Sequence, residues 1–205
     1  MTDHDATEYP LVEIFRSLQG EGRNAGRAVT FVRFAGCNLA CDWCDTDRSR
    51  RFSLTASAIV REVRTLGLRR VVLTGGEPTA VPDMEPLVAA LKADGRWIAV
   101  ETNALVAAPW LAEADYVACS PKAEFADRYD PARMLRRAHE VRIVASSPDM
   151  APFARRMREL IAAEDYYISP CERNGDIDFA TAKQVLGELD DWALSVQLHK
   201  LLGFR

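Results

Sequence analysis

The sequence predicts an α/β fold, namely an incomplete (partial) TIM-type βα barrel with parallel strands. Strand-like runs and segments of helical period alternate along the chain, and such alternation implies βαβ units around a parallel sheet. Four polar motifs stand directly after predicted strands, at the edge where parallel α/β folds hold their active sites. A full eight-fold barrel takes about 250 residues, whereas this chain has 205. With no linker or repeat, residues 1–205 are expected to form one domain.

The strands and two of the helices follow from local pattern. Residues 1–10 are polar and acidic, and we expect them to form a flexible tail. Apolar residues at helical spacing predict helices around 59–66 and 84–91. Runs rich in β-branched and aromatic residues predict strands at 11–15, 29–35, 71–73, 97–100, 116–118, 141–144, 166–168 and 192–197.

Two further helices are predicted from their first residues. Asp130 precedes Pro131, which is typical of an N-cap followed by proline at the first helical position. Asp178 is likewise expected to cap a helix that runs through Leu189.

Composition and charge argue against several classes of partner. Charged residues make up 27% and hydrophobic residues 48% of the chain, which is ordinary for a soluble globular protein. A net charge of −4 argues against a nucleic-acid partner. No apolar run approaches the roughly 20 residues of a membrane span, and the N-terminus lacks the pattern of a signal peptide. We therefore expect a cytoplasmic protein that binds neither nucleic acid nor membrane.

The most informative motif is a cluster of cysteines directly after the predicted strand 29–35. Cys37, Cys41 and Cys44 have the spacing C-x3-C-x2-C. Three thiolates leave one iron of a four-iron cluster open, and an open metal position can hold a reactant. The motif therefore favours a catalytic iron–sulfur cluster.

Three alternatives explain the cysteines less well. A structural zinc site needs a second ligand pair, and the chain has only three histidines and no such pair. A thioredoxin-like motif at 41–44 leaves Cys37 unexplained. A ferredoxin requires a fourth ligand, for which Cys119 and Cys171 stand on separate predicted strands. These two cysteines are expected to be packing residues.

A second motif, Thr74-Gly75-Gly76-Glu77-Pro78, follows a predicted strand. Its glycines permit close approach of the backbone to a ligand. Together the two motifs resemble the radical S-adenosylmethionine (SAM) superfamily, in which the first holds a [4Fe–4S] cluster and the second binds SAM. The resemblance implies a partial barrel of the radical SAM type.

Longer motifs narrow the resemblance to the 7-carboxy-7-deazaguanine synthase family, from about residue 12 to the C-terminus. They are SLQGEG at 17–22, FAGCNL at 34–39, CDT at 44–46, ETN at 101–103, SPK at 120–122 and SVQLHK at 195–200. The resemblance implies a radical SAM lyase that converts 6-carboxy-5,6,7,8-tetrahydropterin to 7-carboxy-7-deazaguanine with loss of ammonia, in queuosine and 7-deazapurine biosynthesis. It also implies Mg²⁺, a homodimer, and an external one-electron donor such as flavodoxin or ferredoxin.

The resemblance also assigns residues to the cofactors. Cys37, Cys41 and Cys44 would ligate the cluster that generates the radical, and Thr46 would contact Mg²⁺, a hard cation that keeps most of its water. Taken alone, a threonine after a cysteine motif is usually an N-cap or a turn residue, so this role is what the resemblance implies. SAM would be bound by Trp43, Cys44, Asp45, Gly76, Glu77, Ser120, Pro121, Lys122, Ser169, Pro170, Cys171 and Glu172. The last four residues and 120–122 also fit simple strand-terminating turns.

The pterin has a hydrogen-bonding edge and a carboxylate, and different residues would suit each. Arg33 alternates with apolar neighbours just before the cysteines, and a guanidinium gives a carboxylate a two-pronged charged hydrogen bond. The other substrate contacts implied by the resemblance are Leu18, Gln19, Gly20, Glu21, Thr74, His199 and the terminal Arg205.

Some positions depart from the family pattern. Arg16 stands where tyrosine is common, Ala104 where glycine is usual, and Ser169 begins a stretch that usually begins with glutamine. Two alternative functions stay open: another small radical SAM enzyme, such as a glycyl-radical activating enzyme, or a non-catalytic metal-binding interaction module. The SLQGEG and Q-x-H-K motifs argue against the first.

Overall fold

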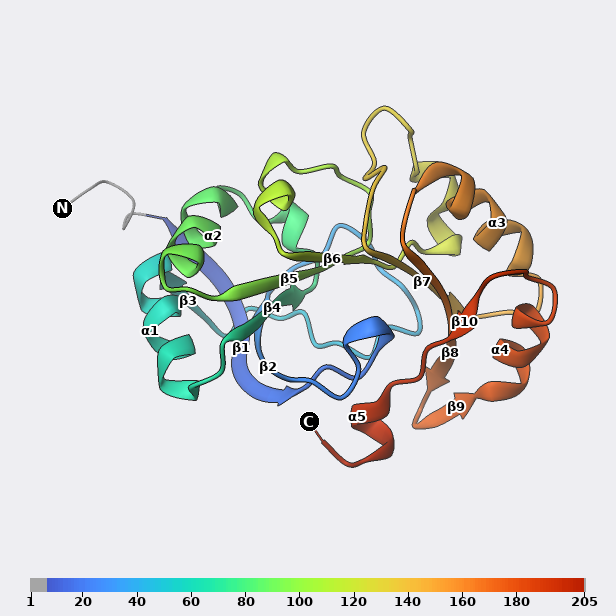
Figure 1. Cartoon of the computed structure of the whole chain (residues 1–205), viewed down its shortest axis with the longest axis horizontal. Helices are drawn as coiled ribbons and strands as arrows, with labels where there is room; N and C mark the ends of the chain where they lie inside the picture. Colours follow the sequence, from blue (N-terminus) through green and yellow to red (C-terminus); the bar gives the residue numbers. More distant parts are fainter. Residues whose placement is uncertain (1–6, 205) are drawn as a thin grey trace.

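The computed structural model describes residues 7–204, whose strands form one curved and mostly parallel sheet (Figure 1). The strands are β1 (Glu8–Leu18), β2 (Ala28–Phe34), β3 (Phe52–Thr55), β4 (Arg70–Gly75), β5 (Trp97–Thr102), β6 (Tyr116–Cys119), β7 (Glu140–Ala145), β8 (Asp165–Arg173), β9 (Asp176–Asp178) and β10 (Ala193–Leu194). The α-helices are α1 (Ala56–Leu66), α2 (Met84–Ala93), α3 (Ala151–Leu160), α4 (Phe179–Leu186) and α5 (Leu198–Leu201).

Strand order confirms the predicted partial barrel. Neighbouring strands follow the order β10-β8-β7-β6-β5-β4-β2-β1-β3, with β9 beside β8. From β2 to β10 every pair in this path is parallel, whereas β1 is antiparallel to β2 and β3. The path has two free ends, so the sheet curves without closing. Figure 1 shows α1, α2, α3 and α4 outside this curve.

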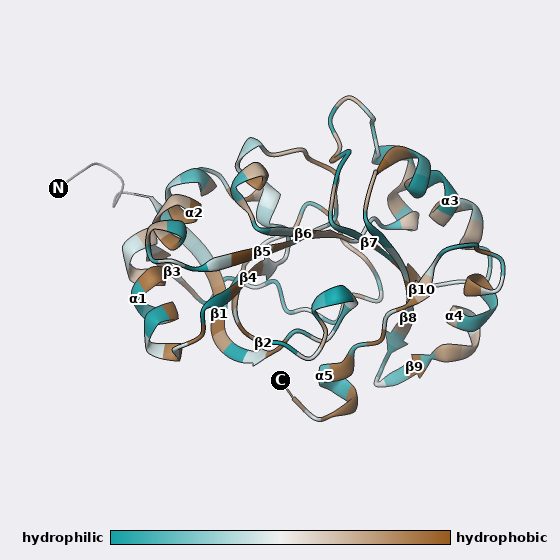
Figure 2. Cartoon of the chain, in the orientation of Figure 1, coloured by the Kyte–Doolittle hydropathy of each residue, from teal (hydrophilic) through white to brown (hydrophobic). Residues whose placement is uncertain are grey.

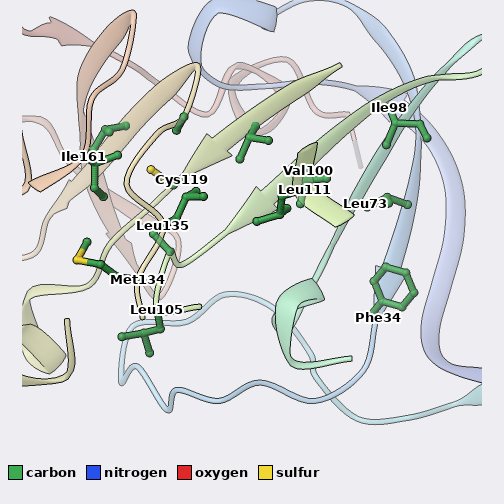
Figure 3. Close-up of a cluster of buried hydrophobic side chains, with 14 of the residues drawn as sticks. Phe34, Leu73, Ile98, Val100, Leu105, Leu111, Cys119, Met134, Leu135 and Ile161 are labelled. Carbon is green, nitrogen blue, oxygen red and sulfur yellow. The ribbon is translucent and has the colours of Figure 1, made fainter. Parts of the chain in front are cut away.

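The main core lies between the sheet and these outer helices. Phe34 and Leu73 on the strands are fully buried and share one hydrophobic cluster with Ile59 of α1 and Leu87 of α2. Figure 3 shows this cluster around β5 and β6, and Figure 2 shows apolar residues on β5 and hydrophilic residues on α3. Burial of the apolar side chains of α1 and α2, at about 25 cal/mol per Å² of apolar surface, fixes which face of the sheet the helices cover.

The capping predictions divide into one success and one error. The carboxylate of Asp178 accepts a hydrogen bond from the Thr181 amide (2.9 Å), which confirms the cap, although α4 ends at Leu186. The helix expected from Asp130 does not form. Instead this segment pairs with the loop after β5, because the Ala107 amide donates to the Arg133 carbonyl (2.8 Å).

Other boundaries also differ from expectation. The expected tail ends before residue 8, since β1 begins there and pairs with β3. Tyr9 is fully buried, and its hydroxyl donates to the Asp83 carbonyl (2.8 Å). The strand expected at 192–197 is reduced to Ala193–Leu194, and α3 was not predicted. Within residues 7–204, no helix has the length and apolar character to cross a bilayer.

Candidate active site

One cavity of about 590 Å³ opens at the carboxyl ends of the parallel strands. Its wall includes the ends of β4, β5 and β6, the SLQGEG loop, the cysteine loop and the chain around α5. A volume of this size is typical of small-molecule sites, which span roughly 300–1,000 Å³. The predicted residues that line it are Leu18, Gln19, Glu21, Arg33, Cys37, Cys41, Trp43, Cys44, Asp45, Thr46, Thr74, Gly76, Glu77, Ser120, Lys122 and His199.

The cysteine loop follows β2 and presents three free thiols. Cys37 and Cys41 are half-buried against the core, and Cys44 is exposed. The Leu39 amide lies 3.4 Å from Cys37 Sγ as a hydrogen-bond donor, the kind of contact that tunes iron–sulfur centres. In residues 7–204 no three His, Cys, Asp or Glu side chains are arranged around a single metal ion. A four-iron cluster instead takes each thiolate at a different iron, so the thiols fit it in kind and number.

The turn after β4 packs directly on the cysteine loop because two of its residues are glycines. Gly75 has a φ of 131°, which favours glycine. A Cβ atom on Gly76 would lie 1.5 Å from the Gly36 carbonyl oxygen. The Gly76 and Glu77 amides donate to the carbonyls of Phe34 and Gly36, both at 3.0 Å. The two motifs recognised in the sequence are therefore one structural unit.

We expect Gly76→Ala to displace this unit, because its methyl group meets backbone atoms and cannot be relieved by a rotamer change. Overpacking of this kind costs about 1–3 kcal/mol. Iron content after reconstitution should fall. Gly187→Ala is the matched control, since its Cβ would meet no atom closer than 3.4 Å. Equal iron loading in both variants would contradict the packing argument.

Glu77 braces the turn from inside. Its side chain is 1% exposed, and its carboxylate accepts hydrogen bonds from Thr79 Oγ1 (2.7 Å), Thr102 Oγ1 (2.6 Å) and the Asn103 amide (2.7 Å). A contact from this turn to SAM would therefore come from the main chain of 76–77 rather than from the Glu77 side chain.

The SPK turn after β6 brings a half-buried cation, Lys122, to the cysteine loop. Lys122 Nζ donates to Ser120 Oγ (2.6 Å) and lies 5.2 Å from the centre of the Trp43 ring. Burial lowers the pKa of Lys122. Trp43 Nε1 donates in turn to Glu124 Oε1 (2.5 Å). Pro121 is buried within the turn.

The Q-x-H-K ending closes the cavity from the other side. Lys200 Nζ pairs with Asp45 of the cysteine loop and with Glu172 of β8. Burial alone would raise the pKa of Asp45, but the hydrogen bond and charge of Lys200 bring it below its usual value. His199 packs on Gly20, where a Cβ atom would lie 1.8 Å from the imidazole Nδ1. Burial lowers the pKa of His199.

Arg33 and Thr46 meet in the cavity wall. Arg33 Nε donates to Glu13 Oε1 (2.9 Å), and its guanidinium lies 3.4 Å from Thr46 Oγ1. Thr46 Oγ1 also donates to Asp45 Oδ1 (3.2 Å). The residue expected to bind a carboxylate thus lies beside the residue expected to contact Mg²⁺.

The acidic floor of the cavity, Glu21 and Glu101, surrounds a cation that the sequence analysis missed. Arg142 of β7 pairs with Glu21 and, at 2.9 Å, with Glu101 Oε1. Gln19 Nε2 donates to the same Glu101 oxygen (2.7 Å). Arg142 stands between apolar residues in the run VRIV. This is the alternation that singled out Arg33, and it could have revealed Arg142 as well.

The stretch at 169–172 stands apart from the cavity lining. Ser169, Pro170 and Cys171 are buried in β8, and Glu172 reaches the site through Lys200. Arg205 lies outside the described residues.

Comparison with known proteins identifies the family. A model of the radical SAM superfamily matches residues 31–139. A 7-carboxy-7-deazaguanine synthase of Haemophilus influenzae is 43% identical over 201 residues, which cover 95% of this chain and 93% of the relative. The chain belongs to the 7-carboxy-7-deazaguanine synthase family. A Neisseria meningitidis member is also 43% identical and covers 96% of this chain and 94% of its own.

The fold agrees with this family. The crystal structure of QueE from Escherichia coli superposes with a TM-score of 0.73 and covers 96% of both chains, at 21% sequence identity. This similarity confirms the predicted partial barrel of the radical SAM type. Radical SAM enzymes use a [4Fe–4S] cluster and SAM, and the free cysteine trio beside the glycine turn fits both.

Proposed function

We propose that the protein is a radical SAM lyase that converts 6-carboxy-5,6,7,8-tetrahydropterin to 7-carboxy-7-deazaguanine with loss of ammonia. The observation that carries the proposal is the shared cavity. It joins the cysteine loop and the glycine turn to an acidic floor and to Arg33 beside Thr46. The Haemophilus influenzae and Neisseria meningitidis relatives of this chain, which it covers almost completely, are both named 7-carboxy-7-deazaguanine synthase.

The chain's own residues divide between cofactors and substrate. When bound, the cluster and SAM would supply the radical chemistry. Cys37, Cys41 and Cys44 hold the cluster in this proposal, and the turns at 76–77 and 120–122 hold SAM with Trp43 and Asp45. Lys122 keeps a cation beside the thiols, and the walls exclude water.

The substrate is held at its two chemically different ends. Arg33 lies on the sheet with its guanidinium 3.4 Å from Thr46 Oγ1. Arg33 would hold the substrate carboxylate, and the Thr46 hydroxyl beside it would contact Mg²⁺. Glu21 and Glu101 at the floor accept hydrogen bonds from the N–H groups of the pyrimidine edge. His199, packed on Gly20, closes the remaining side.

Anaerobic reconstitution tests the function. Reduced enzyme should convert the pterin to the deazapurine in the presence of SAM and Mg²⁺, as measured by mass spectrometry. SAM cleavage without product would overturn the assignment of the substrate, while the assignment to the radical SAM superfamily would stand. A colourless zinc protein would overturn the radical chemistry.

Thr46→Ala should raise the Mg²⁺ concentration needed for half-maximal activity while leaving iron content unchanged, because it removes the hydroxyl beside Arg33 and no thiol of the cysteine loop. Titration of Mg²⁺ against product formation measures the shift. Thr65→Ala, at an exposed position of α1, serves as the control. Loss of iron in Thr46→Ala would show that the residue supports the cluster loop instead.

Further expectations from the family belong to the same proposal. We propose a cytoplasmic homodimer with a single domain over 1–205, reduced by a small one-electron carrier such as flavodoxin or ferredoxin. Cys44 is exposed and Trp43 beside it is half-buried; a cluster near the surface would be within reach of an external electron donor.

A further inference from the structure

A single buried guanidinium lies at the centre of the acidic floor. The Arg142 side chain is 4% exposed, whereas those of Glu21 and Glu101 are 20% and 24% exposed. The two terminal nitrogens of Arg142 bond different partners, Glu21 Oε2 and Glu101 Oε1. Arg142 leaves the second oxygen of Glu21 unused, whereas Glu101 Oε2 accepts a long hydrogen bond from Thr74 Oγ1 (3.3 Å). Both residues line the cavity, and each oxygen of a carboxylate can accept more than one hydrogen bond. The floor thus consists of two carboxylates, Glu21 and Glu101, that are both held by the guanidinium of Arg142.

Arg142 is itself held from behind. Arg142 Nε lies 3.2 Å from Glu140 Oε1, and Glu140 is 2% exposed. Its other oxygen accepts from Tyr116 Oη (2.7 Å) and from the Arg23 amide (2.9 Å). Glu140 is not among the residues that line this cavity, so it pairs with Arg142 and offers nothing to a ligand there.

Sheet register explains how the cluster assembles. Glu101 of β5 pairs with Ala118 of β6, which pairs with Glu140 of β7. Residues two apart on a strand share a face, so Arg142 lies on the face that carries Glu140. The small Ala118 leaves room for Arg142 to reach across β6 to Glu101. Glu21 arrives from the SLQGEG loop, whose Gly22 amide donates to Ser195 Oγ (2.9 Å).

Charge shows why Arg142 is needed. Burial raises the pKa of Glu21. Burial acts in the same direction on Glu101, but the charge and hydrogen bond of Arg142 bring its pKa below the usual value. Three carboxylates share one guanidinium, so the floor keeps acceptor capacity after the ion pairs are formed. Without the cation, two close carboxylates in a desolvated wall would repel each other or take up protons.

We infer that Arg142 is a positioning residue for substrate recognition, which holds Glu21 and Glu101 at the spacing that accepts two N–H groups from the pyrimidine edge of the pterin. The inference rests on the proposed function. Arg142 has no hydrogen-bond acceptor of its own to offer the pterin, so it would contribute to specificity only through Glu21 and Glu101.

The test measures pterin binding and turnover in the reconstituted holoenzyme. Arg142→Lys keeps the charge but loses the two-pronged geometry. We expect its pterin KM, and its Kd without reductant, to rise about tenfold or more, as for loss of a charged hydrogen bond. kcat should change less, while SAM affinity and iron content stay unchanged. Arg64→Lys, an exposed arginine of α1 paired with Asp94, is the matched control.

A second variant separates positioning from folding. Arg142→Met alone leaves buried carboxylates unpaired, which destabilises a protein strongly. Adding Glu140→Gln removes one of these charges and keeps an oxygen for Tyr116 and the Arg23 amide. The double variant should regain thermal stability relative to Arg142→Met, and its pterin affinity should stay low.

The outcomes are decisive in each direction. Wild-type pterin affinity in Arg142→Lys and in the double variant would overturn the inference. Parallel loss of SAM and pterin binding together with stability would also overturn it, because a merely structural role predicts that pattern. A wild-type enzyme that cleaves SAM but binds no pterin would overturn the proposed function and this inference with it.

Discussion

Cys41→Ala is expected to abolish product formation and to leave the reconstituted protein without its iron–sulfur absorbance. Two thiolates, Cys37 and Cys44, would remain in the loop, and a four-iron cluster with an open iron needs three. The fold should survive, because Cys41 is only partly buried at the edge of the core. Iron and sulfide analysis, visible absorbance and SAM cleavage measure the effect.

Cys119→Ala is the matched control for this prediction. Cys119 is fully buried on β6, and burial raises the pKa of its thiol to about 12. A protonated thiol in the core is no metal ligand. Its removal should cost about 1 kcal/mol of stability and leave the iron content unchanged. Equal iron loss in both variants, or none in Cys41→Ala, would contradict the assignment of the ligands.

Local chemistry made much of the site predictable from sequence. The three cysteines are neighbours in the chain, and the glycine turn directly follows a strand, so a short pattern carries each. Ala104 is also instructive. It stands where the family usually has glycine, and in the structure its φ is 68°, a conformation that favours glycine. The departure seen in the sequence therefore marks a strained position.

Long-range pairing was not predictable in the same way. Arg142 meets Glu101 across 41 positions because the sheet register puts both on one face, and it meets Glu21 across 121 positions because the SLQGEG loop reaches the same place. The helix expected after Asp130 failed for a related reason. A local cap competes there with backbone pairing to the loop after β5, and no pattern in the sequence reveals that partner.

Glu77→Ala is expected to lower the free energy of unfolding by about 3–5 kcal/mol, because it leaves several buried donors without an acceptor. The donors are the hydroxyls of Thr79 and Thr102 and the amides of Thr79 and Asn103. The turn after β4 and the end of β5 would then lose their common partner. Denaturant unfolding of the cluster-free protein measures the change directly.

The same variant decides what Glu77 does for SAM. If its carboxylate contacted the cofactor, Glu77→Ala would weaken SAM binding with little loss of stability. The structure predicts instead that Glu77→Ala loses much of its stability, and that SAM affinity changes only because the turn after β4 is displaced. Glu77→Gln keeps one acceptor oxygen and should recover part of the stability. Glu62→Ala, at an exposed position of α1, should leave both quantities near their wild-type values, because a surface glutamate of a helix contributes within about 0.5 kcal/mol.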